Sequence, residues 1–365
     1  MWIILSTIAF LAVTSVIFLN QHSFGRTPRG ERLERIKKSP NYRNGEFQNR
    51  HETQQLTSGK IYFVSLIEFV FKKKERLRPV NEIPTIKTDI QNLTLDEDIL
   101  VWFGHSSYFI QISGKRILVD PILSKSASPV SFINKAFKGT DIYRSEDIPD
   151  IDYLIISHDH WDHLDYKTVI SLKDRINKIV CGLGVGEHFE YWGFDKDNII
   201  ELDWDESVFL DNDFNVYCLP ARHFSGRGLS PNQSLWASFL LETPSIKIYM
   251  GGDSGYDTHF IDIGKRFGEI DLAILDAGQY DKDWKYIHLM PEEVIKAAKE
   301  LNTKSLFPVH NSKYALANHP WDEPLIKISE LHTDDDFILL TPKIGEKIII
   351  QNDNLDFEKW WNNGE

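Results

Sequence analysis

The chain has 365 residues, of which 42% are hydrophobic and 12% aromatic, so it can bury a sizeable core and is neither a fibre nor a disordered chain. Its formal net charge is −13 and its basic stretches lie before residue 80. This charge balance argues against a nucleic-acid partner, since such proteins normally present a basic face. Cys181 and Cys218 lie in apolar contexts, which indicates buried free thiols.

Residues 1–20 are predicted to form a transmembrane or signal-anchor helix. Trp2 to Leu19 carry no charge, and 18 residues are near the lower length for spanning a bilayer. A cleaved signal peptide is the alternative, although no Lys or Arg precedes the run and no small-x-small cleavage pattern follows it. The basic residues that follow are Arg26, Arg29, Arg32, Arg35, Lys37 and Lys38. The positive-inside rule therefore predicts a single-pass anchor with the remaining chain in the cytoplasm.

Residues 21–95 are polar, mixed in charge and interrupted by prolines, which predicts a tether. Within them, residues 60–74 combine apolar side chains with Lys72-Lys73-Lys74, a composition that suits an amphipathic helix on a bilayer. Packing of this segment against the following domain is the alternative.

Residues 96–350 are predicted to form one domain in which short apolar strands alternate with helices. The expected strands are 100–103, 116–119, 235–241 and 272–275, and the expected helices are 166–176, 257–267 and 291–301. This alternation is typical of an α/β fold with mixed layers. Residues 351–365 are expected to form a C-terminal tail.

The segment 157–165 gathers His158, His160, Asp162 and His163. A buried strand is predicted just before it, and the two-residue period of extended chain delivers the first two histidines to one side. Asp162 and His163 follow as the chain turns toward a helix with Asp165 as a plausible N-cap, so they face another point in space. The spacing predicts two adjacent metal ions; a polar loop that only caps a helix is the alternative.

Two ions need further ligands, and three later apolar strands each end in a suitable side chain: His223, Asp253 and His310. Gly251 and Gly252 allow the backbone to approach closely, which suits a short carboxylate that bridges two ions. Imidazole and carboxylate donors favour zinc, with manganese or iron also possible, and a coordination position open to water.

Several segments resemble, in order, the motifs of the metallo-β-lactamase fold superfamily. They are Gly104-His105-Ser106-Ser107, Leu118-Val119-Asp120-Pro121, the histidine cluster, Ala221-Arg222-His223-Phe224-Ser225, Gly252-Asp253-Ser254-Gly255-Tyr256 and Pro308-Val309-His310. Over roughly residues 98 to 342 the chain is similar to the N-acyl-phosphatidylethanolamine-hydrolysing phospholipase D branch, through motifs such as Ala127-Ser128-Pro129 and Ile200-Glu201-Leu202-Asp203-Trp204. The resemblance implies a four-layer αββα sandwich with metals in a cleft at one edge of the sheets.

The resemblance also implies a ligand set for two zinc ions. The implied ligands are His158, His160 and His223 for one ion, Asp162, His163 and His310 for the other, and Asp253 as the bridge between them. By the same analogy, His105 and Asp120 orient ligands or shape the cleft.

His288 matches a family histidine near the substrate phosphate, and it precedes Pro291-Glu292-Glu293, a typical helix start. Asp162, Asp253 and His288 are thus the expected catalytic residues; a capping role is the alternative for His288. Asp276 and Asn311 depart from the family pattern, which affects the expected pocket shape and charge preference.

The expected function is that of a membrane-tethered binuclear zinc hydrolase, a phosphodiesterase of N-acyl-phosphatidylethanolamine phospholipase D type that uses a metal-bridging hydroxide. Its expected partners are the membrane and a phospholipid or small phosphodiester substrate, and the sequence favours no particular oligomeric state. One alternative is a metal-dependent hydrolase of a soluble lactone or phosphate ester. Another is a non-catalytic binding protein on the same fold.

Overall fold

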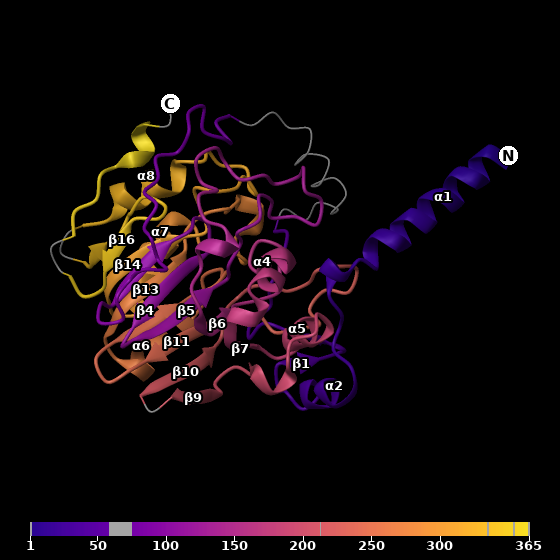
Figure 1. The fold of residues 1–365 in the computed structure, drawn as a ribbon, viewed down its shortest axis with the longest axis horizontal. Helices are drawn as coiled ribbons and strands as arrows, with labels where there is room; N and C mark the ends of the chain where they lie inside the picture. Colours follow the sequence, from indigo (N-terminus) through magenta and orange to yellow (C-terminus); the bar gives the residue numbers. More distant parts are fainter. Residues whose placement is uncertain (1, 58–74, 212, 334–335, 353–354, 364–365) are drawn as a thin grey trace.

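The structure is a computed structural model that describes residues 2–57, 75–211, 213–333, 336–352 and 355–363 (Figure 1). Within these residues, two seven-stranded sheets form the centre of the domain, and a short hairpin forms a third, two-stranded sheet. The hairpin consists of β1 (Tyr42–Arg43) and β2 (Glu46–Phe47). The predicted amphipathic helix at 60–74 lies outside the described residues.

The first sheet combines antiparallel and parallel strands. Its order is β16 (Lys347–Ile349), β3 (Ile99–Trp102), β4 (Tyr108–Ile112), β5 (Lys115–Val119), β6 (Ile151–Ile156), β7 (Ile176–Gly182) and β8 (Ile199–Leu202). The strands from β5 to β8 pair in parallel. Their carboxyl ends therefore share one edge of the sheet.

The second sheet has the same mixed character. Its order is β15 (Ile338–Leu339), β14 (Thr303–Val309), β13 (Ile270–Asp276), β12 (Lys247–Met250), β11 (Ser238–Glu242), β10 (Phe214–Leu219) and β9 (Ser207–Asp211). The strands from β12 to β15 pair in parallel, so this sheet also collects strand ends along one edge.

The outer face of the first sheet is covered by α4 (Tyr166–Ser171) and α5 (Gly186–Tyr191), and that of the second by α6 (His259–Phe267), α7 (Pro291–Glu300) and α8 (Glu323–Leu331). Two helices, α1 (Trp2–Leu19) and α2 (Gly30–Ile36), precede both sheets in the chain. Short 3₁₀ turns occur at His22–Phe24, Ser145–Asp147, Lys173–Arg175, Lys196–Asn198, Lys282–Trp284 and Trp360–Asn363.

Alternating strand residues build three apolar layers, as the two-residue period of strands requires. Trp102 and Ile155 from the first sheet face Phe239 and Phe307 from the second in the central layer. A second layer joins the first sheet to α4 and α5, and a third joins the second sheet to α6, α7 and α8. The expected four-layer αββα sandwich is therefore confirmed.

α1 projects from the domain as an exposed apolar helix (Figure 1). It has a mean hydropathy of 2.4, and its length and composition suffice to cross a membrane. No buried face explains its apolar composition, because none of its residues is buried. It is therefore a candidate membrane anchor.

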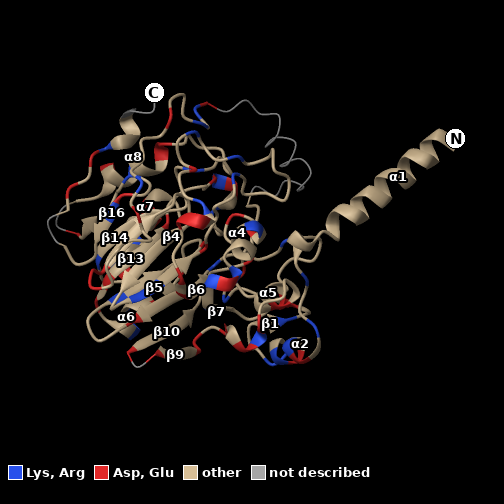
Figure 2. Ribbon diagram, viewed as in Figure 1, with Lys and Arg blue, Asp and Glu red and all other residues tan. Residues whose placement is uncertain are grey.

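The sequence predicts a tether after α1, whereas the described part of residues 21–95 packs on the domain. Arg32 on α2 reaches Glu187 at 2.5 Å and Glu201 at 2.6 Å, and both carboxylates are almost fully buried. Figure 2 shows this mixture of charges where α2 meets the domain. Charged residues of this segment thus form ion pairs with buried carboxylates of the domain. Local sequence patterns do not distinguish such residues from charged residues exposed to solvent.

The end of the chain also packs, although the sequence predicts a tail. Trp360 is 1% exposed, lies 6.5 Å from Trp102 between ring centroids, and donates its indole N–H to the carbonyl of Thr341 at 3.1 Å. The tail thereby covers one end of the central layer.

We expect Trp360→Ala to lower the free energy of unfolding by about 3–5 kcal/mol, because it removes a large buried aromatic ring. Denaturant unfolding checks this value. Phe209→Ala is the control, since Phe209 is 77% exposed and its loss should change stability by less than about 0.5 kcal/mol. Equal stability of the two variants would contradict the packed tail.

Candidate metal centre

The turn between β6 and α4 holds the histidine cluster in a compact loop. The backbone N–H groups of His163 and Leu164 both donate to the carbonyl of His160, at 3.1 and 2.9 Å. Asp165 then caps α4 by accepting from the N–H groups of Lys167 and Thr168, as predicted. The loop is therefore fixed at its strand end and at its helix end.

The other candidate ligands arrive at strand ends of the second sheet. His223 follows β10, Asp253 follows β12 and His310 follows β14. Gly252 has a φ of 60°, and a Cβ there would lie 2.8 Å from the Cβ of Ser157. Glycine is needed at this position because the Asp253 backbone passes so close to the histidine loop.

The first predicted ligand group, His158, His160 and His223, is brought together. The Nε2 of His158 lies 2.9 Å from the Nδ1 of His160, and the Nε2 of His223 lies 3.3 Å from the same atom. These ring nitrogens fall within one cluster that could hold a metal ion.

The second predicted group, Asp162, His163 and His310, forms another cluster that also includes His105. The Asp162 Oδ2 lies 3.0 Å from the His105 Nε2 and 3.7 Å from the His163 Nε2. His105 therefore lies within ligand distance of this group, closer than the sequence indicated.

The carboxylate of Asp253 lies between the two groups. Its Oδ2 is 3.1 Å from the His163 Nε2, 3.7 Å from the His223 Nε2 and 3.9 Å from the His158 Nε2. Its Oδ1 is buried, lies 3.0 Å from the His310 Nδ1, and accepts no hydrogen bond of normal geometry among the described residues. A buried carboxylate that faces several imidazoles in this way fits the coordination of a divalent metal ion.

Other groups orient the imidazoles from behind. Asp120 Oδ2 lies 2.8 Å from the His163 Nδ1, and the carbonyl of Ile287 lies 2.8 Å from the His223 Nδ1. Such contacts fix the ring orientation and leave the opposite nitrogen directed at the cluster. The orienting role expected for Asp120 has this geometric basis.

Burial controls the protonation of the cluster. It lowers the pKa of His158, His223 and His310 well below the usual value, which favours the neutral imidazole that a metal binds. The pKa of His163 shifts in the opposite direction, because the carboxylates of Asp253 and Asp162 outweigh the effect of burial and raise it. The site therefore combines neutral imidazoles at His158, His223 and His310 with a charged group formed by His163 and the neighbouring carboxylates.

His288 lies beside the cluster and is paired with Asp276. Its Nδ1 is 2.7 Å from the Asp276 Oδ2, and its ring centroid is 5.1 Å from those of His223 and His310. Burial raises the pKa of Asp276 to about 7, although His288 opposes this shift. The two residues that depart from the family pattern thus have different contacts. Asp276 pairs with His288, whereas the buried Asn311 donates to the carbonyl of Val309 at 3.0 Å.

Two backbone positions at the cluster adopt left-handed conformations that non-glycine residues rarely take. His105 has a φ of 56° and His310 a φ of 65°. The His310 N–H donates to the carbonyl of His105, and the His105 N–H donates to that of Asn311, both at 3.1 Å. The two strained turns therefore hold each other in place across the sheets.

Asp159 lies inside the cluster segment, but its spacing did not predict a role for it. Its carboxylate is buried, 3.0 Å from the His188 Nε2, and accepts from the hydroxyl of Ser234 at 2.8 Å and the N–H of Gly226 at 2.7 Å. It points away from the candidate ligands and braces their loop. The alternation of side chains after β6 could have indicated this opposite direction.

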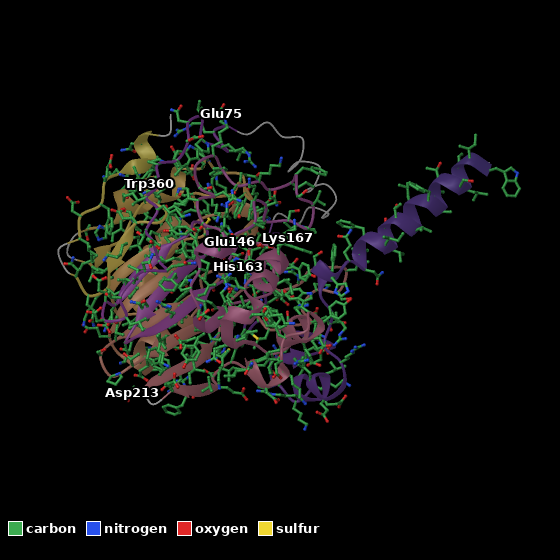
Figure 3. The ribbon with its side chains drawn as sticks, viewed as in Figure 1. Glu75, Glu146, His163, Lys167, Asp213 and Trp360 are labelled. Atoms are coloured by element: carbon green, nitrogen blue, oxygen red, sulfur yellow. The ribbon has the colours of Figure 1, made fainter. Side chains whose placement is uncertain are left out.

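His163 is fully buried, and its label lies near the middle of the domain in Figure 3. The described residues thus form a buried cluster that could hold a metal ion.

Comparison with known proteins agrees with this geometry. A family model described as the β-lactamase superfamily domain matches residues 115–311. A Mycobacterium bovis protein without a described function is 34% identical over 327 residues, covering 88% of this chain and 87% of its own. N-acyl-phosphatidylethanolamine-hydrolyzing phospholipase D 1 of Caenorhabditis elegans is 28% identical over 311 residues, covering 79% and 87%.

The fold is also similar to that of Igni18, a metallo hydrolase from Ignicoccus hospitalis, with a TM-score of 0.53 at 19% identity over 69% of this chain and 97% of that one. The family match covers more than half of the chain and contains most of the clustered residues. The chain therefore belongs to the metallo-β-lactamase superfamily and is a metal-dependent hydrolase of that superfamily.

Proposed function

We propose that the protein is a membrane-tethered binuclear zinc phosphodiesterase that cleaves N-acyl phosphatidylethanolamine or a related phospholipid. The observation that carries the proposal is the buried Asp253 carboxylate, which lies between two groups of imidazoles, with Oδ1 3.0 Å from the His310 Nδ1 and Oδ2 3.1 Å from the His163 Nε2. One carboxylate facing two such groups suits a bridge between two ions.

The residues proposed to hold the ions are His158, His160 and His223 for one, Asp162, His163 and His310 for the other, and Asp253 for both. When bound, a pair of zinc ions lowers the pKa of water and neutralises charge on a phosphoryl group. Asp120 and Ser157 keep the His163 and His158 rings in place during turnover, since they contact the nitrogens opposite the cluster.

His288 is proposed to contact the phosphoryl oxygens. Its Nδ1 faces Asp276, so its Nε2 is the nitrogen left for the substrate, and Asp276 raises the pKa of His288 against the effect of burial. An N–H donor held in this way stabilises negative charge that develops on a phosphoryl oxygen.

The phospholipid substrate class is supported by the relative from Caenorhabditis elegans, which is named for hydrolysis of N-acyl phosphatidylethanolamine. It is supported further by α1, an apolar helix with no buried residues that leads directly into the domain. An anchored domain meets lipid substrates in its own bilayer, whereas a soluble substrate requires no anchor.

The first prediction concerns metal content. Purified protein should carry about two zinc ions per chain, because seven ligands exceed one tetrahedral site. Asp253→Ala should lose both ions, as measured by elemental analysis. Asp213→Ala, an exposed carboxylate distant from His163 in Figure 3, should keep them. An active wild-type protein with a single ion would contradict the binuclear proposal.

The second prediction concerns the substrate. Hydrolysis of N-acyl phosphatidylethanolamine in detergent micelles should release phosphatidic acid and an N-acyl ethanolamine, as measured by mass spectrometry. Asp253→Ala serves as the control for contaminating hydrolases. Rapid hydrolysis of a soluble lactone, with no phosphodiester cleaved, would instead support a lactonase.

In the same assay, His288→Ala should lower kcat about 10²-fold while the metal content stays unchanged, because it removes one donor to the developing charge. The control is His51→Ala, an exposed histidine that pairs with Asp257. Loss of metal from the His288 variant would assign that residue to metal binding instead.

The third prediction concerns topology. The basic residues after α1 favour a cytoplasmic domain. Protease added outside intact cells should leave the domain whole and should digest it only after permeabilisation, as followed by immunoblotting. Digestion in intact cells would place the domain on the other side of the membrane.

A further inference from the structure

The base of α1 is connected through Phe24 to the loop that carries the candidate metal ligands. Phe18 in α1 lies 5.2 Å from Phe24, and Phe24 lies 4.9 Å edge-to-face from Trp161. Trp161 stands between His160 and Asp162 in the chain and supports the guanidinium of Arg227 at 4.0 Å from its ring. The end of the apolar helix is therefore fixed next to the site.

A cleft of about 930 Å³ opens beside this contact. Trp161 and the residues directly after α1, Gln21 to Ser23, line one side, and the loop from Ser124 to Gly139 lines the other. The lysines that line the cleft are Lys125, Lys135, Lys138 and Lys167, and all of them are exposed. Figure 3 shows Lys167 on the side of His163 that faces α1 in that view.

The carboxylates in this cleft do not neutralise the lysines. Asp165 is buried and accepts from the start of α4, and Asp141 reaches Lys125 only at 4.0 Å. Within the described part of the chain, Lys135, Lys138 and Lys167 form no ion pair with a carboxylate. The cleft is thus locally basic in a chain of net charge −13.

Exposed apolar side chains flank the same helix. Phe132 is 74% exposed and Ile133 44% exposed in the loop that carries the lysines. Leu229 is 82% exposed and borders a second hollow, which Leu19 and Phe24 also line. The cleft with the lysines and the hollow bordered by Leu229 therefore both reach the point where α1 leaves the domain.

We propose that this α1-base surface, formed by Phe132, Ile133, Leu229 and the four cleft lysines, docks on the anionic phospholipid surface of the bilayer that holds α1. Lysines near a bilayer are attracted to anionic headgroups, and apolar side chains enter the interface. A bilayer is the expected occupant, because the cleft lysines and the exposed apolar side chains lie near the base of a helix that is long and apolar enough to cross a membrane.

Docking holds the Trp161 side of the ligand loop at headgroup depth. A single helix allows the domain to rotate and tilt, whereas a second contact fixes its orientation. The proposal requires α1 to lie in a membrane but does not require any particular hydrolytic reaction, so its test is independent of turnover.

The test uses the full chain in lipid nanodiscs with an environment-sensitive fluorophore on Phe132→Cys. Cys181 and Cys218 are buried and leave the new thiol as the reactive one among the described cysteines. Nitroxide-labelled lipid should quench the fluorophore at least about twofold more in discs with phosphatidylglycerol than in discs of phosphatidylcholine alone. The matched position is Phe209→Cys on β9, which is 77% exposed and lies far from α1 in Figure 1, and it should show no such quenching.

Replacing Lys125, Lys135, Lys138 and Lys167 by glutamine should abolish the difference between the two lipids at the Phe132 position. The charge-matched control replaces Lys265, Lys296, Lys299 and Lys327, which lie on α6 to α8, and should preserve it. Equal quenching at both labelled positions would overturn the proposal. So would quenching at the Phe132 position that is the same in both lipids and unchanged by replacing the cleft lysines.

Discussion

The burial of the Asp253 carboxylate among imidazoles is the constraint on which the remaining structure depends. A buried carboxylate is costly unless positive charge faces it. Here His163 faces one oxygen and its charge lowers the pKa of Asp253 against the effect of burial. The same arrangement explains why the glycine before Asp253 must approach Ser157 so closely, and why neighbouring turns tolerate strained backbone.

The sequence predicted those parts of the site whose position follows from a single strand or turn. His158 and His160 could be placed by the period of one strand, and His223 and His310 by the ends of two others. The pairing of Asp276 with His288 could not, because it joins a strand end to a separate loop. Sequence patterns counted Arg32 only among the basic residues that follow the anchor, since its partner Glu187 lies 155 residues away in the chain.

The fold was predictable for a similar reason. Apolar runs predicted some strands of each sheet, such as β5 and β13, and the helices α6 and α7, since each shows its buried face within about ten residues. Trp360 carries no such periodicity, and its burial depends on the space next to Trp102. The segments predicted as tether and tail thus pack through contacts with residues that are distant in the chain, which local patterns do not show.

The N-terminal segment links the anchor to the site through a chain of contacts. The N–H of Arg26 donates to the His188 Nδ1 at 3.1 Å, the His188 Nε2 faces Asp159 at 3.0 Å, and Asp159 directly follows His158. The histidine loop comes from the first sheet, while His223, Asp253 and His310 come from the second. The spacing of the candidate ligands therefore depends on the apolar layer between the sheets. The orientation of the histidine loop depends on the contacts that run from Arg26 through His188 to Asp159.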